Sequence, residues 1–221
     1  MTSTIVKLCG NHSLQDLRDS VCSGANYIGI VFAESKRKVD AVQCGKWLQQ
    51  IKINPNQKLV GVFVNPSLQE ISYVLQHVPL DIIQFHGHET REQIIEVKMA
   101  TSILVWKAIH HSDYGVDRMK DFHRIVDGYV IDSKVRGAWG GTGEIFDWGA
   151  IPSYKKEAER QDVTCLIAGG ITPDNIDQLL AYSPQGIDIS SGIETNGKKD
   201  SSKIRALLER LKIYDNSKLP R

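Results

Sequence analysis

Two short runs of glycine and serine near the end of the chain have the composition of a phosphate-binding site. Residues 168–174 contain Gly170, and residues 187–192 contain Ser190 and Ser191. Each run follows an apolar segment and leaves several backbone N–H groups beside a small side chain or none, so an anionic oxygen can approach the backbone. The pair therefore predicts a phosphate site, although one Gly-Gly pair alone would more often mark only a turn.

Other residues that could do chemistry stand where predicted strands end. They are Cys9, Arg37 in a basic loop, His86 and Asp132. A thiol and a carboxylate would share one pocket if these strand ends meet. Each residue also has a simpler interpretation: a cysteine there is often a small hydrophobic residue, an aspartate often caps a helix, and a basic turn is often only solvated.

The elements that must position these residues alternate along the whole chain. Eight apolar runs read as strands, at residues 5–9, 27–32, 59–64, 82–86, 103–109, 129–132, 165–167 and 186–189. Amphipathic stretches separate them, with helix starts expected near Ser13, Ser67 and Pro173 and a short fifth helix within residues 110–125. Strands that are apolar on both faces indicate a buried parallel sheet. We therefore predict a single (β/α)8 TIM barrel with eight parallel strands, a fold whose last two strand loops commonly hold phosphate.

Composition agrees with one domain covering residues 1–221. The chain has 41% hydrophobic residues and a formal net charge of +1, and it has no linker or charge-biased half. The balanced charge gives no reason to expect nucleic acid or an anionic membrane as a partner. The chain has no 18-residue apolar run and no signal-like start, and its four cysteines are scattered, so we expect a cytoplasmic protein without a disulfide framework.

Several motifs occur in one order nearly from end to end. They are KLCG at 7–10, FAESKRKV at 32–39, GVFVN at 61–65, QFHG at 84–87, DSK at 132–134, GGTG at 140–143, FDW at 146–148, AGGI at 168–171 and DISSGIE at 188–194. Together they resemble the phosphoribosylanthranilate isomerase family of tryptophan biosynthesis. Phe85 stands where that family usually has leucine, and residues 11–13 depart from its usual Thr-Arg, but neither departure touches a catalytic position.

The resemblance implies an Amadori rearrangement of N-(5-phosphoribosyl)anthranilate to 1-(2-carboxyphenylamino)-1-deoxyribulose 5-phosphate. Such an enzyme is an intramolecular oxidoreductase-type isomerase that interconverts an aldose and a ketose and needs no cofactor. By resemblance, Asp132 is the general acid and Cys9 the general base. The resemblance also implies a role in substrate binding for Arg37, which would hold the anthranilate carboxylate, for His86, and for Gly170, Ser190 and Ser191, which would hold the phosphate.

These roles carry expectations about protonation. Asp132 would need burial to raise its pKa, and Cys9 would need a positive neighbour to lower its pKa. Strand alternation places Lys7 on the same side as Cys9, one layer deeper, and we expect its ammonium to pair with Asp188 on the strand that closes the barrel. The glycine-rich residues 137–143 read as a lid over the site.

Other possibilities remain open. Another barrel enzyme acting on a phosphorylated sugar would share the two phosphate loops but use different bases, and a non-catalytic phosphosugar-binding barrel would be expected to lose the acid or the base. His86 and His88 suggest a metal site, but no third ligand of suitable spacing stands out, so we expect no metal. The partner is then a small phosphorylated substrate, and the lack of an extended apolar helix face favours a monomer.

Overall fold

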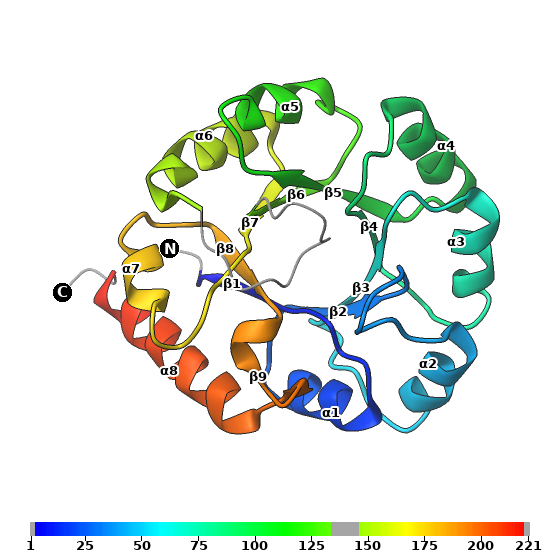
Figure 1. Cartoon of the computed structure of the whole chain (residues 1–221), viewed down its shortest axis with the longest axis horizontal. Coiled ribbons are helices and arrows are strands. Elements are labelled where there is room, and N and C mark those ends of the chain that lie inside the picture. Colours follow the sequence, from blue (N-terminus) through cyan, green and yellow to red (C-terminus); the bar gives the residue numbers. More distant parts are fainter. Residues whose placement is uncertain (1–2, 134–145, 219–221) are drawn as a thin grey trace.

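A computed structural model describes residues 3–133 and 146–218 of the chain. Eight parallel strands form a closed barrel in sequence order, with β8 hydrogen-bonded back to β1 (Figure 1). The strands are β1 (Ile5–Leu8), β2 (Tyr27–Val31), β3 (Lys58–Phe63), β4 (Ile82–Phe85), β5 (Leu104–His110), β6 (Gly128–Asp132), β7 (Thr164–Ile167) and β8 (Gly186–Ile189). The predicted fold class is confirmed. The expected lid at residues 137–143 lies outside the described residues.

Helices surround the barrel as an outer ring (Figure 1). They are α1 (Leu14–Cys22), α2 (Ala41–Leu48), α3 (Leu68–Leu75), α4 (Arg91–Thr101), α5 (Gly115–Asp121), α6 (Ile151–Gln161), α7 (Ile176–Leu180) and α8 (Ser201–Ser217). Ser13 and Ser67 cap α1 and α3 as expected, because each side chain accepts a hydrogen bond from a backbone N–H of the first turn. The fifth helix is short, at 7 residues.

One helix begins later than predicted. The amphipathic pattern from Pro173 predicted a helix start there, whereas α7 begins at Ile176. The Asn175 side chain accepts from the backbone N–H of Thr172 at 2.8 Å and donates to the backbone carbonyl of Gly170 at 2.8 Å. These bonds hold the chain as a compact loop after β7, since an asparagine side chain can replace the backbone partners that a helix would supply.

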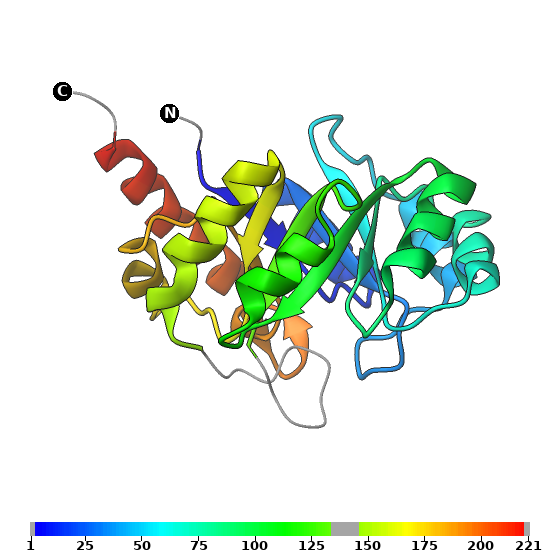
Figure 2. The same ribbon diagram turned by 90° about the horizontal axis from the view of Figure 1, so that it is seen from above.

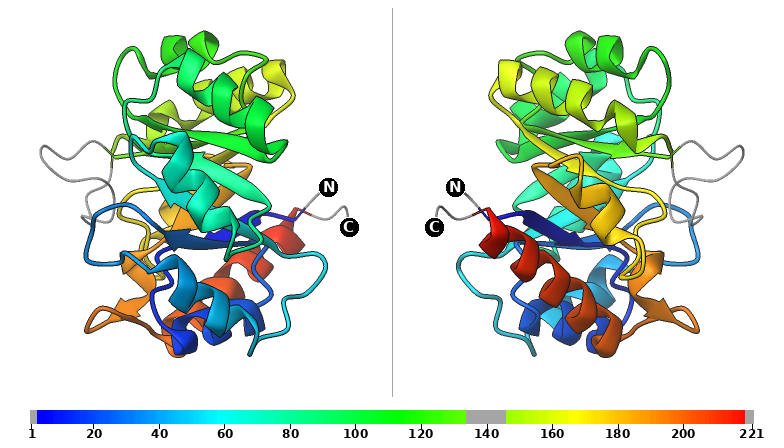
Figure 3. Two further views of the ribbon diagram at one scale, coloured as in Figure 1. Left: turned by 90° about the vertical axis from the view of Figure 1, so that its right-hand side faces the viewer. Right: turned by 90° about the vertical axis from the view of Figure 1, so that its left-hand side faces the viewer.

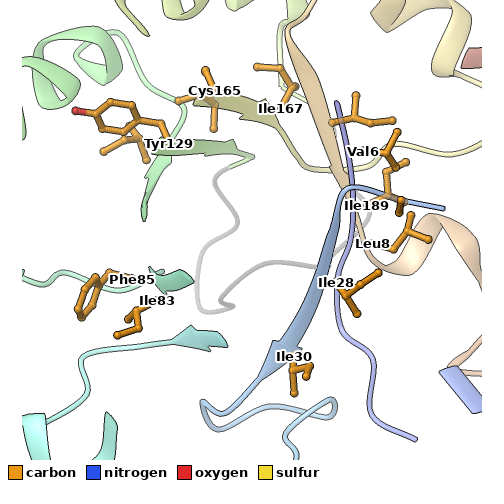
Figure 4. Packing of buried hydrophobic residues seen from close by; sticks show 14 of the residues in the cluster. Val6, Leu8, Ile28, Ile30, Ile83, Phe85, Tyr129, Cys165, Ile167 and Ile189 are labelled. Atoms are coloured by element: carbon orange, nitrogen blue, oxygen red, sulfur yellow. The ribbon is translucent and has the colours of Figure 1, made fainter. Parts of the chain in front are cut away.

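Alternation along the strands divides the buried residues into two layers. One set, including Val6, Leu8, Ile28 and Ile189, points outward and packs beneath the helices (Figure 4). A smaller set fills the barrel interior and includes Val60, Ile82, Trp106, Ala108, Val130, Leu166 and Ala168. Cys9, His86 and Asp132 have the sequence parity of the interior set, so they lie above its packed layers at the carboxyl ends of the strands.

The carboxyl ends of the strands carry an additional small hairpin after β8. It consists of a 3-10 turn at Ser191–Ile193 followed by β9 (Glu194–Thr195) and β10 (Lys198–Lys199), an element the sequence pattern did not predict. Figures 2 and 3 show the start of β1 and the end of α8 at the opposite end of the barrel. Among the described residues, no helix combines the length and apolar character needed to cross a membrane.

Candidate active site

A cavity of about 580 Å³ opens among the carboxyl ends of the strands. Every site residue predicted from the sequence contributes to its lining: Cys9, Arg37, His86, Asp132, Gly170, Ser190 and Ser191. The fold thus brings together a thiol, a carboxylate and the two glycine and serine loops in one place, as the strand ends of a parallel barrel require.

Cys9 follows β1 at the wall of this cavity. Its backbone N–H donates to the carbonyl of Ile189 at 2.8 Å, and its side chain is packed closely against Gly29 of β2. A Cβ at Gly29 would lie 2.7 Å from the sulfur, so only glycine leaves room for the thiol there. Cys9 is 9% exposed, so it reaches the cavity from a largely buried position.

Lys7 lies below Cys9 and pairs with Asp188 as predicted. Its Nζ is 2.7 Å from Oδ2 of Asp188, and the two residues face each other in the β1–β8 register. Burial raises the pKa of the Cys9 thiol, and the neighbouring Lys7 ammonium only partly offsets this rise. The expected net lowering of the Cys9 pKa is therefore wrong for this state of the protein: the thiol keeps its proton because desolvation of the thiolate outweighs the favourable charge.

Asp132 ends β6 and is held by groups on two sides. His86 Nε2 lies 3.2 Å from Asp132 Oδ2, and the backbone N–H of Ser133 donates to Oδ1 at 2.8 Å. The expected net rise of the Asp132 pKa is wrong for this state of the protein. Burial acts in that direction, but the hydrogen bond from His86 and the charges of His86 and His110 lower the pKa overall.

Gln84 extends the hydrogen-bonded series of Asp132 and His86 into the barrel interior. Its Nε2 lies 3.1 Å from Nδ1 of His86. In this amide orientation Gln84 donates to Nδ1, so a neutral His86 ring carries its proton on Nε2 and donates it to Asp132. The Gln84 Oε1 is buried and has no hydrogen-bond partner among the described residues. Alternation from His86 along β4 would have pointed to Gln84, because residues two apart share one side of a strand.

His110 is a site residue that the sequence analysis missed. It ends β5, faces Asp132 in the β5–β6 register, and offers a nitrogen that lies within 4.8 Å of ligand atoms of both His86 and Asp132. Burial and the nearby His86 lower the His110 pKa. The signal was available in its position directly after the fifth predicted strand, residues 103–109, next to the strand that carries the carboxylate.

The two predicted phosphate loops adopt conformations that depend on glycine. Gly169 and Gly170 have φ of +89° and +63°, and a Cβ at Gly169 would lie 2.5 Å from the Ser133 hydroxyl oxygen. Ser190 precedes the 3-10 turn that begins at Ser191. The left-handed backbone after β7 and the turn after β8 thus face the same cavity with small side chains, an arrangement suited to an oxyanion.

Arg37 reaches the cavity from the loop after β2 and is held by an ion pair. Its Nε and Nη2 donate to the two carboxylate oxygens of Glu194 at 2.8 and 2.7 Å, and Glu194 also accepts from Lys199 at 2.9 Å. Gly10, at φ +77°, allows this packing because a Cβ there would lie 2.5 Å from Arg37 Cδ. Sequence reasoning did not identify Glu194 or Lys199 as part of the site, since both lie on the unpredicted hairpin.

Comparison with known proteins supports the resemblance found in the sequence. Residues 6–210 match the family model described as N-(5'-phosphoribosyl)anthranilate (PRA) isomerase. The chain is 52% identical to N-(5'-phosphoribosyl)anthranilate isomerase of Geobacillus thermodenitrificans over 97% of this chain and 96% of the relative. It is 46% identical to the enzyme of the same name from Halalkalibacterium halodurans over 98% of this chain and 99% of the relative.

Solved structures agree. Phosphoribosyl anthranilate isomerase from Thermotoga maritima superimposes with a TM-score of 0.80 at 30% identity, covering 95% of this chain and 98% of that chain. A phosphoribosyl anthranilate isomerase in complex with reduced 1-(o-carboxyphenylamino)-1-deoxyribulose 5-phosphate superimposes with a TM-score of 0.78 at 29% identity, with the same coverage.

The closed barrel and its cavity define a (β/α)8-barrel enzyme with its candidate acid–base groups at the carboxyl ends of the strands. Within that class, the family model and the relatives are specific. The chain belongs to the phosphoribosylanthranilate isomerase family.

Proposed function

We propose that this protein catalyses the Amadori rearrangement of N-(5-phosphoribosyl)anthranilate in tryptophan biosynthesis, with Asp132 as general acid and Cys9 as general base. Family membership supports the reaction, and one observation supports the roles. The thiol and the carboxylate line the same cavity as the two loops suited to phosphate. A substrate anchored by its phosphate there would present its sugar ring between the two groups.

The chemistry needs one proton donor and one proton acceptor. Asp132 protonates the furanose ring oxygen, the ring C–O bond breaks, and the substrate becomes a protonated Schiff base. Cys9 then removes the proton at C2, and the C–H electron pair forms the enolamine, which tautomerises to the aminoketose. The positive charge of the Schiff base makes the C2 proton more acidic and favours a thiolate beside it, so a thiol of raised pKa can still serve as the base.

Asp132 must gain a proton before it can act as the acid. The substrate carries a phosphate and a carboxylate, and nearby negative charge raises the pKa of a carboxyl group. The Gln84–His86 pair is compatible with that change. If the Gln84 amide turns over, its Oε1 accepts from Nδ1 of His86, and Nε2 then accepts a hydrogen bond from a protonated Asp132.

Substrate binding in this proposal uses the two ends of the cavity. The phosphate binds backbone N–H groups of Gly170, Ser190 and Ser191, and the anthranilate carboxylate binds Arg37. Glu194 occupies the Nε and Nη2 edge of the guanidinium, so the carboxylate would meet Arg37 at the edge that carries Nη1. A crystal grown in sulfate or phosphate tests where the phosphate binds. We expect the anion at the backbone N–H groups of Gly170, Ser190 and Ser191. An anion at Lys36 or Lys38 instead would mean that the basic loop binds the phosphate.

Replacing each proton-transfer residue tests the mechanism. Cys9→Ala and Asp132→Asn are each expected to lower turnover by about a hundredfold or more, since each removes one partner of a proton transfer. The assay follows the fluorescence decay of freshly made phosphoribosylanthranilate. Cys22→Ala on α1 and Asp117→Asn on α5 are matched controls at exposed positions and should keep normal turnover.

The result separates the remaining alternatives. Near-normal turnover in a folded Cys9→Ala or Asp132→Asn protein would remove that residue from the mechanism. A wild-type protein that binds a reduced product analogue but does not consume phosphoribosylanthranilate would instead be a phosphosugar-binding barrel without this activity.

A further inference from the structure

The ends of three consecutive strands bring two imidazoles and a carboxylate together, and two of the three residues, His86 and Asp132, line the cavity. His86 follows β4, His110 ends β5, and Asp132 ends β6. Each offers one nitrogen or oxygen atom, and all three atoms lie within 4.8 Å of one another. The two histidines that drew attention in the sequence, His86 and His88, are thus not the relevant pair.

The spacing of one pair of these atoms, on His86 and Asp132, matches the coordination of a tetrahedral ion, and His110 lies within 4.8 Å of both. Two ligands at zinc distances of about 2.0–2.1 Å lie about 3.3 Å apart. The His86 Nε2 and Asp132 Oδ2 atoms are 3.2 Å apart, so an ion can take the place of the shared proton without drawing these two side chains closer. The His86 and His110 rings are edge to face, with centroids 5.6 Å apart.

The residues that contact the ligand side chains are also suited to a metal site. A zinc-bound imidazole usually donates its second N–H to a fixed acceptor, which holds the ring in place. Gln84 can supply that acceptor, because its buried Oε1 has no partner among the described residues and its amide already contacts His86 Nδ1. The His86 proton then moves from Nε2 to Nδ1, and the ring releases no proton. The Ser133 N–H fixes the other oxygen of Asp132 in the same way.

We propose that His86, His110 and Asp132 form an inhibitory site for a divalent transition-metal ion such as Zn²⁺. The ion takes three protein ligands and leaves its fourth position open toward the cavity. Zinc sites that exchange a water or substrate have the same arrangement of three protein ligands and one open position. A bound ion occupies the carboxylate that the proposed function uses as its acid, so the inhibitory effect rests on that function. Metal binding itself does not depend on it.

Spectroscopy of the cobalt form tests binding without an activity readout. EDTA-treated, dialysed protein is titrated with Co²⁺, and the visible absorption of the bound ion is followed. We expect saturation at one equivalent, displacement by Zn²⁺, and no displacement by Mg²⁺, which prefers oxygen ligands in octahedral geometry. Loss of a supporting hydrogen bond typically costs 10–100-fold in metal affinity, so Gln84→Leu should weaken binding by about that factor.

Variants of two histidines decide which groups bind. His110→Gln should weaken Co²⁺ binding by at least about tenfold, because it removes a ligand. His77→Gln is the matched control, because His77 lies just beyond the carboxyl end of α3 and should bind no ion. Unchanged Co²⁺ affinity and spectrum in a folded His110→Gln protein would overturn the site, as would failure of the wild type to bind Co²⁺ at one equivalent.

Turnover then tests inhibition. Saturating EDTA should leave the metal-free enzyme unchanged, Zn²⁺ should inhibit it reversibly, and His110→Gln should need at least about tenfold more Zn²⁺. Co²⁺ binding that is weakened by His110→Gln, together with turnover that Zn²⁺ does not inhibit, would confirm the metal site and contradict the acid role of Asp132. Absence of turnover under all conditions, with Co²⁺ binding intact, would contradict the proposed function alone.

Discussion

The ammonium of Lys7 is buried inside the barrel beside a carboxylate and a thiol. Burial alone would lower its pKa, but Asp188 and Cys9 raise it, and the net direction is upward. Lys7 is therefore charged at neutral pH and compensates Asp188, whose Oδ1 has no further hydrogen-bond partner among the described residues. The pair links the closing strands of the barrel to the proposed base.

Removing this ammonium should destabilise the fold. Lys7→Met leaves the Asp188 carboxylate buried without its partner, which is expected to lower the free energy of unfolding by about 3–5 kcal/mol unless Asp188 takes up a proton. Urea denaturation at neutral pH measures the loss. The double variant Lys7→Met with Asp188→Leu is the control and should recover most of the stability, since no charge is then left unpaired. Equal stability of Lys7→Met and wild type would contradict a stabilising pair.

The thiol of Cys9 should ionise at a higher pH than the thiol of an ordinary cysteine. Because burial raises its pKa, the rate of alkylation should have its midpoint above the reference value of about 8.5, and Lys7→Met should move the midpoint further up. A group with a raised folded-state pKa contributes stability below the unfolded pKa and loses it as pH rises, so the free energy of unfolding should also fall above about pH 8.5. The measurement uses a Cys22→Ala background. An unshifted profile in Lys7→Met would leave Lys7 a structural role only.

At the scale of elements, the β9–β10 hairpin holds Arg37 against the cavity. Glu194 at the start of β9 binds both Arg37 and Lys199, and Lys199 also donates to the Ser190 carbonyl at 3.1 Å. These two cations lower the pKa of Glu194, although burial opposes them. The hairpin therefore links the basic loop after β2 to the loop after β8 that is proposed to bind phosphate, and these two loops are far apart in the sequence.

This arrangement predicts different effects for the two partners of the ion pair. Arg37→Ala should reduce kcat/KM by an amount equivalent to about 2–3 kcal/mol, the value of a charge-assisted pair with the substrate carboxylate. Glu194→Gln keeps hydrogen-bonding atoms and the arginine, so it should act mainly on KM and by less. Steady-state kinetics of both folded variants provides the test. An unchanged kcat/KM in Arg37→Ala would exclude its role in binding the substrate.

At the scale of the whole molecule, the described surface gives no single apolar face. The exposed large hydrophobic residues lie on several helices around the barrel, among them Val42 on α2, Tyr73 on α3 and Met99 on α4. A relative from Thermotoga maritima is described as dimeric. Because scattered apolar residues do not make a stable interface, we expect a monomer here.

Sedimentation equilibrium tests this expectation. The fitted mass should be that of one chain over a wide range of protein concentration, and thermal unfolding should follow one cooperative transition that does not move with concentration. A mass of two chains, or a midpoint that rises with concentration, would show that the protein associates.

Local patterning was sufficient for much of this protein. Eight apolar runs separated by amphipathic stretches determined the barrel, because strands buried on both faces and helices buried on one have different periodicities. The same period of two placed Lys7 below Cys9 and against Asp188, since neighbouring parallel strands bring equivalent positions together. The motif order was enough to indicate the family, and the strand ends identified the residues that line the cavity.

The protonation of the site and its supporting contacts were decided only by tertiary structure. Asp132 has a lowered pKa because His86, 46 positions away in the chain, approaches it, and Arg37 is held by Glu194, 157 positions away. The pKa of a buried group depends on its distances to other charges and on how much water is excluded around it. The spacing of residues in the sequence gives neither quantity. His110 joins the site for the same reason, because it becomes a neighbour of Asp132 only when β5 pairs with β6.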